Sequence, residues 1–226
     1  MSEAYDKNVR CSDLFDVDVP YIAPLFDGVD YPWEILPKIK EYCLSLVGKG
    51  IPGFCEICPG VLVGDNVKIH PSAVLTAPAI IGPGTEIRPG AYLRGSVITG
   101  PDCVVGNSTE LKNAVLLRHV QVPHYNYVGD SVLGNFAHMG AGAVCSNVKS
   151  DGKPVVIHGD ADYPTGLRKV GAMLGDGADI GCGSVLNPGT VIGKGTSVYP
   201  LTPVRGVVPA GMIVKSQTDI VIRRGE

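Results

Sequence analysis

Aromatic residues are scarce in this sequence: they make up 6% of 226 residues, although 45% of the residues are hydrophobic. A core built from this chain must therefore be filled by aliphatic and small side chains. Glycine (30) and proline (18) are abundant, which favours many turns and few long helices. We therefore expect short aliphatic elements that are joined by tight turns.

Several other features are missing, and each absence excludes a class of protein. No apolar run approaches the ~20 residues that span a bilayer, and the polar, acidic first residues are unlike a signal peptide. A net charge of −3 gives no general attraction to nucleic acid or to anionic membranes. Seven scattered cysteines indicate reduced thiols rather than a disulfide framework. We expect a soluble, cytoplasmic protein with no nucleic-acid or membrane partner.

The hydrophobic residues that are present recur every six positions. From Val63 the steps of six fall on aliphatic residues with one exception, on Val63, Ile69, Leu75, Ile81, Ile87, Leu93, Thr99, Val105, Leu111 and Leu117. The repeat resumes as Leu174, Ile180, Leu186, Ile192, Val198 and Val204. A helix would need spacings of three and four, so the pattern predicts short strands, one per hexad. Three such hexads per coil describe a parallel β-helix, an all-β solenoid.

Interruptions of this repeat divide the chain. We expect an N-terminal segment (1–57) whose helical spacing over 32–47 indicates a helix that caps the first coil. Coils should follow over 58–148 and 172–206, separated by an inserted loop or hairpin (149–171), with a tail over 207–226. The step of six would place Pro123 in the core, so the sequence predicts that the repeat is abandoned over 123–127.

A coil of three hexads predicts which side chains stack. Arg94 and Lys112 are 18 apart and should point outward in neighbouring coils, with Thr76 and no carboxylate in the same column of the coil below. Two stacked cations repel each other, so they predict either an anion site or a solvated surface pair. His124 should stand over Gly106, which would leave open space beside the imidazole. Histidine can accept a proton near neutral pH, so His124 is a candidate general base.

Other motifs favour alternatives. Cys55 and Cys58 form a CxxC, without the second pair that a zinc site would need. His119 and His124 have the H-x4-H spacing of hexapeptide-repeat carbonic anhydrases, but no third ligand is evident. No glycine-rich nucleotide loop occurs. We therefore expect no metal site and no nucleotidyl transfer.

The stretch "STELKNAVLLRHVQVPHYNYVGDSVLGNFAHMGAGAVCSNV" resembles the acetyltransferase domain of bifunctional UDP-N-acetylglucosamine pyrophosphorylase/glucosamine-1-phosphate N-acetyltransferase. The wording "VPHYNYVGDS" is more similar to the archaeal sugar-1-phosphate nucleotidylyltransferases that carry this domain. The resemblance covers roughly residues 60–206 and includes no pyrophosphorylase domain. It implies a left-handed parallel β-helix, acetyl-CoA as co-substrate and a homotrimer with sites between subunits.

The resemblance also implies roles for residues that match the family position by position. His124 matches the general base, Arg94 and Lys112 match residues that bind the substrate phosphate, and Tyr127 matches a substrate-binding tyrosine. His138 stands where the family has a substrate-binding asparagine, so the resemblance implies that it contacts the substrate. Positions on the acyl-CoA side are matched by Ala141, Asn147, Lys169, Cys182 and Pro200.

These expectations predict an enzyme that moves an acetyl group from acetyl-CoA to an amine or hydroxyl of a sugar phosphate or nucleotide sugar. Two alternatives remain: a non-catalytic protein that binds sugar phosphates or nucleotide sugars, and a metal-dependent hydratase. Thiol release and elemental analysis would separate them. The sequence does not name the acceptor or the acyl chain.

Overall fold

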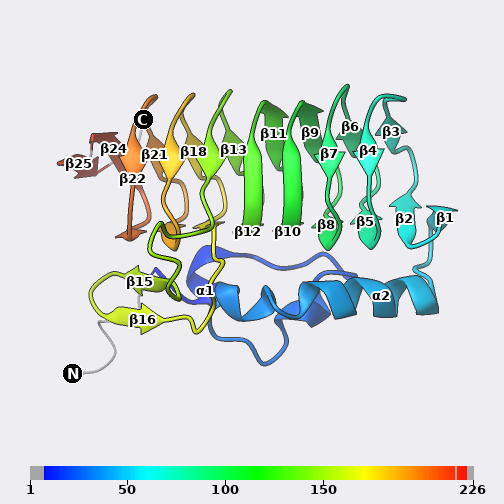
Figure 1. The fold of residues 1–226 in the computed structure, drawn as a ribbon, viewed down its shortest axis with the longest axis horizontal. Coiled ribbons are helices and arrows are strands. Elements are labelled where there is room, and N and C mark those ends of the chain that lie inside the picture. Colours follow the sequence, from blue (N-terminus) through cyan, green and yellow to red (C-terminus); the bar gives the residue numbers. More distant parts are fainter. Residues whose placement is uncertain (1–7, 217, 223–226) are drawn as a thin grey trace.

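The computed structural model describes residues 8–216 and 218–222, and its main feature is a β-solenoid of short parallel strands (Figure 1). Each coil has three faces, which we call A, B and C, and the chain visits them in the order A, C, B. The β-helix that the hexad repeat predicts is confirmed. None of the helices in the described part of the chain is both long and apolar enough to cross a bilayer.

Face A carries strands that pair in parallel from coil to coil. Its strands are β2 (Val61–Gly64), β5 (Ala79–Ile81), β8 (Val97–Thr99), the second halves of β10 (Glu110–Leu116) and β12 (Tyr127–Leu133), β17 (Ala172–Leu174), β20 (Thr190–Ile192) and β23 (Val207–Val208). Because β10 and β12 bend from face B onto face A, the two faces share one sheet.

Faces B and C repeat the same arrangement. Face B holds β4 (Val74–Leu75), β7 (Tyr92–Leu93), the first halves of β10 and β12, β14 (Val144–Cys145), β19 (Val185–Leu186) and β22 (Pro203–Val204). Face C holds β3 (Lys68–Ile69), β6 (Glu86–Ile87), β9 (Val104–Asn107), β11 (Gln121–His124), β13 (His138–Met139), β18 (Asp179–Ile180), β21 (Ser197–Val198) and β24 (Met212–Ser216). The parallel ladder therefore continues past residue 206, where we expected the coils to end.

The six-residue repeat of buried core residues breaks before residue 123. After Leu111 the buried core residue is Leu116, followed by Val122 and Val128, so the chain omits one residue, and the coils from here to the insertion are one residue shorter than three hexads. Asn113 explains the shortening. At this corner the preceding coil uses two residues with left-handed backbone, whereas Asn113 (φ 49°) makes the corner alone. The sequence prediction placed the break at Pro123 and Leu117 in the core, and both are wrong.

The N-terminal segment packs along face A. It contains α1 (Cys11–Leu14), two 3₁₀ helices, η1 (Ala23–Phe26) and η2 (Pro32–Ile35), and α2 (Ile39–Lys49). Ile39 and Cys43 of α2 are buried in one cluster with outward residues of face A such as Ile80 and Ile98. Figure 1 shows α2 lying lengthwise beside the coils. The helix therefore covers a side of the solenoid and not the end of its first coil, where we expected it.

Antiparallel hairpins complete the chain. β1 (Phe54–Cys58) pairs with β2 at the first coil, and β25 (Asp219–Ile222) pairs with β24 at the last. The inserted segment forms a hairpin of β15 (Val156–His158) and β16 (Asp162–Pro164), and it leaves the solenoid at a corner between faces B and A. Its Tyr163 ring lies 6.1 Å from the Trp33 ring, which joins the insertion to the N-terminal segment.

Candidate functional site

Arg94 and Lys112 lie in neighbouring coils at the corner between faces B and A, which we call the cation corner. The pairing of Leu93 with Leu111 gives them the stacking that their spacing predicts. Each cation has a carboxylate partner: Arg94 Nη1 lies 2.7 Å from Glu110 Oε1, and Lys112 Nζ lies 3.1 Å from Asp130 Oδ2. The hydrogen bond to Glu110 is the main cause that raises the pKa of Arg94. The repulsion that the stacked pair predicts is therefore compensated, and Asp130 itself lies 18 residues after Lys112.

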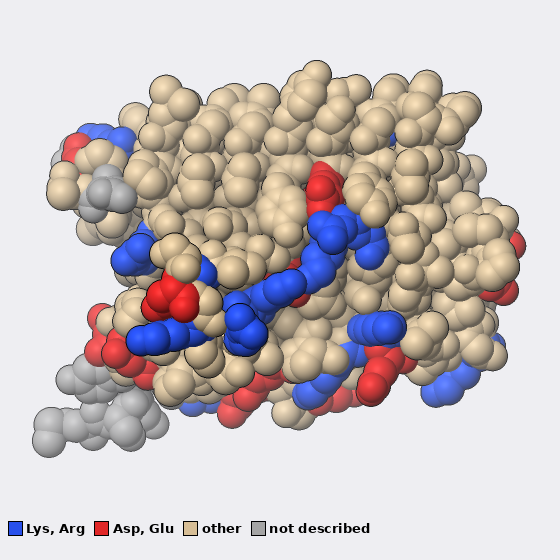
Figure 2. All heavy atoms as spheres, in the orientation of Figure 1, with Lys and Arg blue, Asp and Glu red and all other residues tan. Residues whose placement is uncertain are grey.

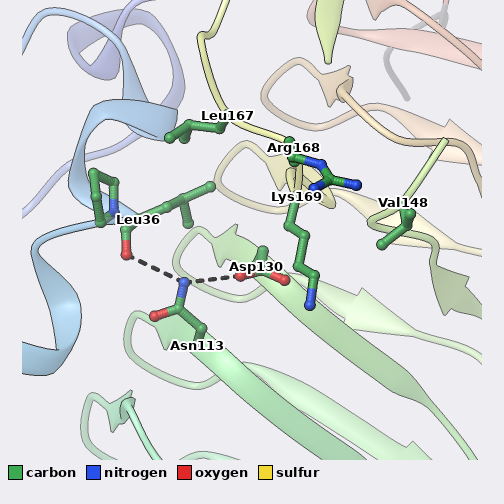
Figure 3. Close-up of a pocket in the computed structure, with 8 residues that line it drawn as sticks. Leu36, Asn113, Asp130, Val148, Leu167, Arg168 and Lys169 are labelled. Carbon is green, nitrogen blue, oxygen red and sulfur yellow. Dashed lines mark hydrogen bonds between the residues drawn. The ribbon is translucent and has the colours of Figure 1, made fainter. Parts of the chain in front are cut away.

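Asp130 is the centre of this corner. Its side chain is only 6% exposed, and besides Lys112 it accepts hydrogen bonds from Asn113 Nδ2 (2.9 Å) and from Asn147 Nδ2. Asn113 Nδ2 also donates to the carbonyl oxygen of Leu36 (3.1 Å), which ties the N-terminal segment to the same network (Figure 3). A buried carboxylate needs such donors, because burial without them is costly. Sequence reasoning missed Asp130, Asn113 and Glu110.

Tyr127 borders this network on face B. Asn147 Nδ2 donates to its hydroxyl oxygen at 3.2 Å. Burial raises the pKa of Tyr127, and the hydrogen bond from Asn147 opposes that shift. The phenol is therefore neutral at physiological pH and can donate a hydrogen bond to a ligand. The structure thus brings Arg94, Lys112, Tyr127 and Asn147 together.

Lys169 lies at the neck of the insertion, beside the cation corner. Val148 and Lys169 pair across the neck in an antiparallel bridge, and Val170 N donates to Asn147 O at 3.0 Å. A cavity of about 400 Å³ opens here, and Figure 3 shows Lys169 extending past Asp130. Figure 2 shows a band of Lys and Arg atoms running obliquely across this side of the molecule.

His124 stands at a different corner, between faces C and B. Its side chain is exposed, and within residues 8–216 and 218–222 the imidazole has no hydrogen-bond partner. The buried side chain of Asn126 fixes the turn after His124. Its Nδ2 donates to Gly140 O (2.8 Å) and Ala143 O (3.2 Å), and its Oδ1 accepts from His124 N.

The coil shortening also changes the neighbour of His124. His124 pairs with Asn107, and Gly106 lies against the backbone of Pro123, where an added Cβ would clash with the carbonyl. The predicted open space at Gly106 is therefore wrong, because the shorter coil moves the register by one. The histidine faces solvent and not a gap in the coil.

Three of the residues assigned to the acyl-CoA side share the corner of His124. Backbone hydrogen bonds connect the turns in order: Gly142 N to His124 O, Gly183 N to Ala141 O, and Leu201 N to Cys182 O. Ala141, Cys182 and Pro200 are all exposed. This His124 corner is therefore a continuous column of small exposed residues above the histidine.

The other candidates lie elsewhere. His138 is on face C, where its Nδ1 lies 2.8 Å from Asp179 Oδ1, so the structure does not bring it to the cation corner. His119 stacks on Phe136 (centroids 4.8 Å apart) at the opposite end of β11 from His124. Cys55 and Cys58 are exposed on β1. Within the part of the chain described, no three His, Cys, Asp or Glu side chains form a group that could hold a metal.

Face B separates the two corners. Lys112 pairs with Gly129, and from His124 to Gly129 an extended chain reaches at most roughly 17 Å, which is the upper limit for the distance between the corners. A single chain therefore presents the cations and the histidine at opposite edges of one face, with Tyr127 between them.

These features define a hexapeptide-repeat β-solenoid with two polar corners. Comparison with known proteins agrees: residues 75–161 match the family model described as the GMPPB C-terminal domain. The chain is similar to bifunctional protein GlmU, as the sequence resemblance predicts. It is 31% identical over 182 residues to the protein of Methanococcus maripaludis (78% of this chain, 43% of that protein). It is 33% identical over 157 residues to that of Methanocaldococcus jannaschii (67% and 38%).

The chain spans less than half the length of these relatives. A solved structure with similar architecture is a point mutant of AntD, an N-acyltransferase from Bacillus cereus, in complex with dTDP-4-amino-4,6-dideoxyglucose and coenzyme A. Its TM-score is 0.46 at 19% identity, and the match covers 78% of this chain and 93% of that one.

Proposed function

We propose that the protein is an acyl-CoA-dependent acyltransferase that moves an acetyl group to an amine or hydroxyl of a sugar phosphate or nucleotide sugar. The observation that carries this proposal is the His124 corner, where an exposed imidazole heads a column of small exposed residues and, among the described residues, has no partner. The similarity to bifunctional GlmU, which includes His124 and the cation corner, supports it.

In this proposal His124 takes the proton from the acceptor as the acceptor attacks the thioester carbonyl. The tetrahedral oxyanion is stabilised by backbone N–H groups, and the coenzyme thiolate leaves. Ala141, Cys182 and Pro200 have small side chains that leave room for the coenzyme along the corner.

The cation corner binds the phosphorylated part of the acceptor. Arg94 and Lys112 supply charge, while Tyr127 and Asn147 supply hydrogen bonds; Lys169 adds a cation at the neck of the insertion. An incoming phosphate competes with Glu110 and Asp130 for the same cations, so we expect the ion pairs to rearrange when it binds.

A homotrimer with sites between subunits is the assembly that the sequence resemblance implies. In one chain the cations and His124 lie at opposite edges of face B. A neighbouring chain that packs on face B would add its own side chains, such as His138 of its face C, to the site. Light scattering should then give about three times 23.7 kDa.

A thiol-release assay with acetyl-CoA and a panel of amino-sugar phosphates tests the activity. His124→Asn should lower the rate by roughly 10²–10⁴, with acyl-CoA affinity nearly unchanged. Because a base must be deprotonated, kcat/KM of the unaltered protein should decrease on the acid side. His158→Asn is the matched control, since this exposed histidine pairs with Asp162 on the insertion.

Full turnover of a folded His124→Asn variant would remove His124 from the mechanism. Binding of sugar phosphates without any thiol release would favour the non-catalytic alternative.

A further inference from the structure

The residue before each strand of face B lies at the corner between faces C and B, and in successive coils these residues form a column inside the solenoid. The pairing of the strands places them one above another. The buried members, in order along the chain, are Ala91, Thr109, Asn126, Ala143, Ser184 and Thr202. All of them are Ala, Ser or Thr except Asn126, which is 2% exposed and is the one member with a side-chain amide.

Asn126 also changes how the turn at His124 is closed. In neighbouring coils the backbone N–H of the column residue closes its own turn, and the bonds are Ala91 N to Arg88 O, Thr109 N to Gly106 O and Ala143 N to Gly140 O. Asn126 N donates instead to Thr109 Oγ1 in the preceding coil, at 3.3 Å. His124 N donates to Asn126 Oδ1 at 3.1 Å. A side chain therefore shapes the turn that carries the histidine.

The same amide reaches the next coil. Asn126 Nδ2 donates to Gly140 O at 2.8 Å and to Ala143 O at 3.2 Å, so both of its hydrogens are used. These two carbonyl groups flank Ala141, the first of the small exposed residues above His124. Buried amides keep such hydrogen bonds because no water is present to replace the lost partner. Asn126 therefore joins the His124 turn to the Ala141 turn.

The imidazole of His124 depends on this backbone for its position. Within residues 8–216 and 218–222 the ring has no hydrogen-bond partner. A catalytic base is commonly oriented by a third group that bonds to it directly. Here the described contact that fixes the histidine is the one from its backbone N–H to Asn126 Oδ1.

We propose that Asn126 is a positioning residue, which holds His124 at a fixed distance from the Ala141 turn. This inference rests on the proposed function, in which His124 takes the proton of the acceptor and Ala141 lies beside the coenzyme. Asn126 is buried below both turns, so it acts through the backbone and contacts neither the acceptor nor the coenzyme. Its removal should change the geometry of proton transfer and leave both binding sites intact.

Steady-state kinetics of Asn126→Ala test the positioning role. The variant places at this position the residue that the column has at Ala91 and Ala143, so the solenoid should still fold. Without the amide, the turn can close through its own backbone as the neighbouring turns do, which moves His124. Misplacing a reacting group by about 1 Å costs up to ~10²-fold in rate, so kcat should fall by roughly 10–100-fold. KM for acetyl-CoA and for the phosphorylated acceptor should stay nearly unchanged.

Asn135→Ala is the matched control. Asn135 is 6% exposed and lies at the corner between faces A and C. Its amide is bonded in the same way: Oδ1 accepts from Arg118 N (3.1 Å), and Nδ2 donates to Asp16 O (2.8 Å) and Asp176 Oδ1 (3.1 Å). Asn135→Ala should lower the melting temperature at least as much as Asn126→Ala and should keep its kcat. Equal losses of kcat in the two variants would overturn the proposal, because they would reflect general destabilisation.

Nuclear magnetic resonance of histidine-labelled protein separates this inference from the proposed function. The chain has five histidines, and the ring signals of His124 should shift in Asn126→Ala and stay in place in Asn135→Ala. If the unaltered protein releases no thiol although these signals shift, the acyltransferase is contradicted and the positioning of His124 is not. If it does release thiol, full kcat in folded Asn126→Ala overturns the positioning role. Without thiol release, unshifted His124 signals overturn it.

Discussion

Replacing Asp130 with alanine removes the acceptor that three side chains share. Lys112 Nζ, Asn113 Nδ2 and Asn147 Nδ2 all donate to this carboxylate, which is 6% exposed. Removing one partner of a buried ion pair costs ~3–5 kcal/mol, because it leaves the other charge without compensation. Lys112 is one quarter exposed and can regain some hydration, so the lower part of that range, ~3–4 kcal/mol, is the better expectation.

Thermal unfolding measures this loss. For a chain of this length 1 kcal/mol corresponds to roughly 2–4 °C, so Asp130→Ala should lower the melting temperature by about 6–16 °C. Asp130→Asn should melt between the unaltered protein and Asp130→Ala, because the amide oxygen still accepts from Asn113 or Asn147. Glu110→Ala is the matched control: it also removes the carboxylate partner of a cation at this corner, but the Glu110 carboxylate is 31% exposed where Asp130 is 6% exposed, so its effect should be small. If Asp130→Ala and Glu110→Ala have the same melting temperature, the buried network does not stabilise the fold.

The remaining predictions concern the coils and the thiols. Gly106→Ala should destabilise the protein by more than the ~1–3 kcal/mol typical of an overpacked core, because the new Cβ would clash with the Pro123 backbone. Gly48→Ala on α2, where an added Cβ meets open space, should stabilise it by up to ~1 kcal/mol. Urea titrations measure both effects, and equal effects would refute the register of β9 and β11. A thiol reagent at neutral pH should modify the exposed Cys55, Cys58 and Cys182 and spare Cys103 and Cys145. Burial raises the pKa of both spared thiols to about 12, so the reactive thiolate forms only at strongly alkaline pH, and rapid labelling of Cys145 in the folded protein would contradict the burial.

The architecture could be predicted because each coil obeys the same local rule. An aliphatic residue every sixth position can be buried only if short strands turn at regular corners, and this held from Val63 to Leu111 and again from Leu174 to Val204. The inserted hairpin was visible as an interruption of the rule. The placement of the helix along face A was not, because a helix with one apolar side fits an end or a flank equally well.

The shortened coils could not be read from the repeat. Leu116 and Leu117 are adjacent and both aliphatic, so the pattern does not say which one points inward. The corner at Asn113 determines that Leu116 points inward, because its left-handed backbone makes the turn with one residue fewer. Asp130 makes the corner of the next coil in the same way. Asparagine and aspartate adopt the left-handed conformation more readily than most residues, so Asn113 and Asp130, which are 17 and not 18 residues apart, were the indication of shortened coils in the sequence.

The shortened coil also determines which side chains meet at the cation corner. A coil of three full hexads would pair Lys112 with Asp130, which lies 18 residues later, whereas the shorter coil pairs Lys112 with Gly129. In the shorter coils Asn113 and Asp130 become successive corner residues, and the carboxylate comes within 3.1 Å of Lys112. The shorter coil therefore places Asp130 opposite Asn113, where one carboxylate accepts from both Lys112 and Asn113, while Lys169 and Arg168 on the insertion have no carboxylate partner among the described residues. An anion that binds at this corner must reach those two side chains or displace Asp130 from Lys112, and anion binding to Lys169→Ala and Lys112→Ala distinguishes the two routes.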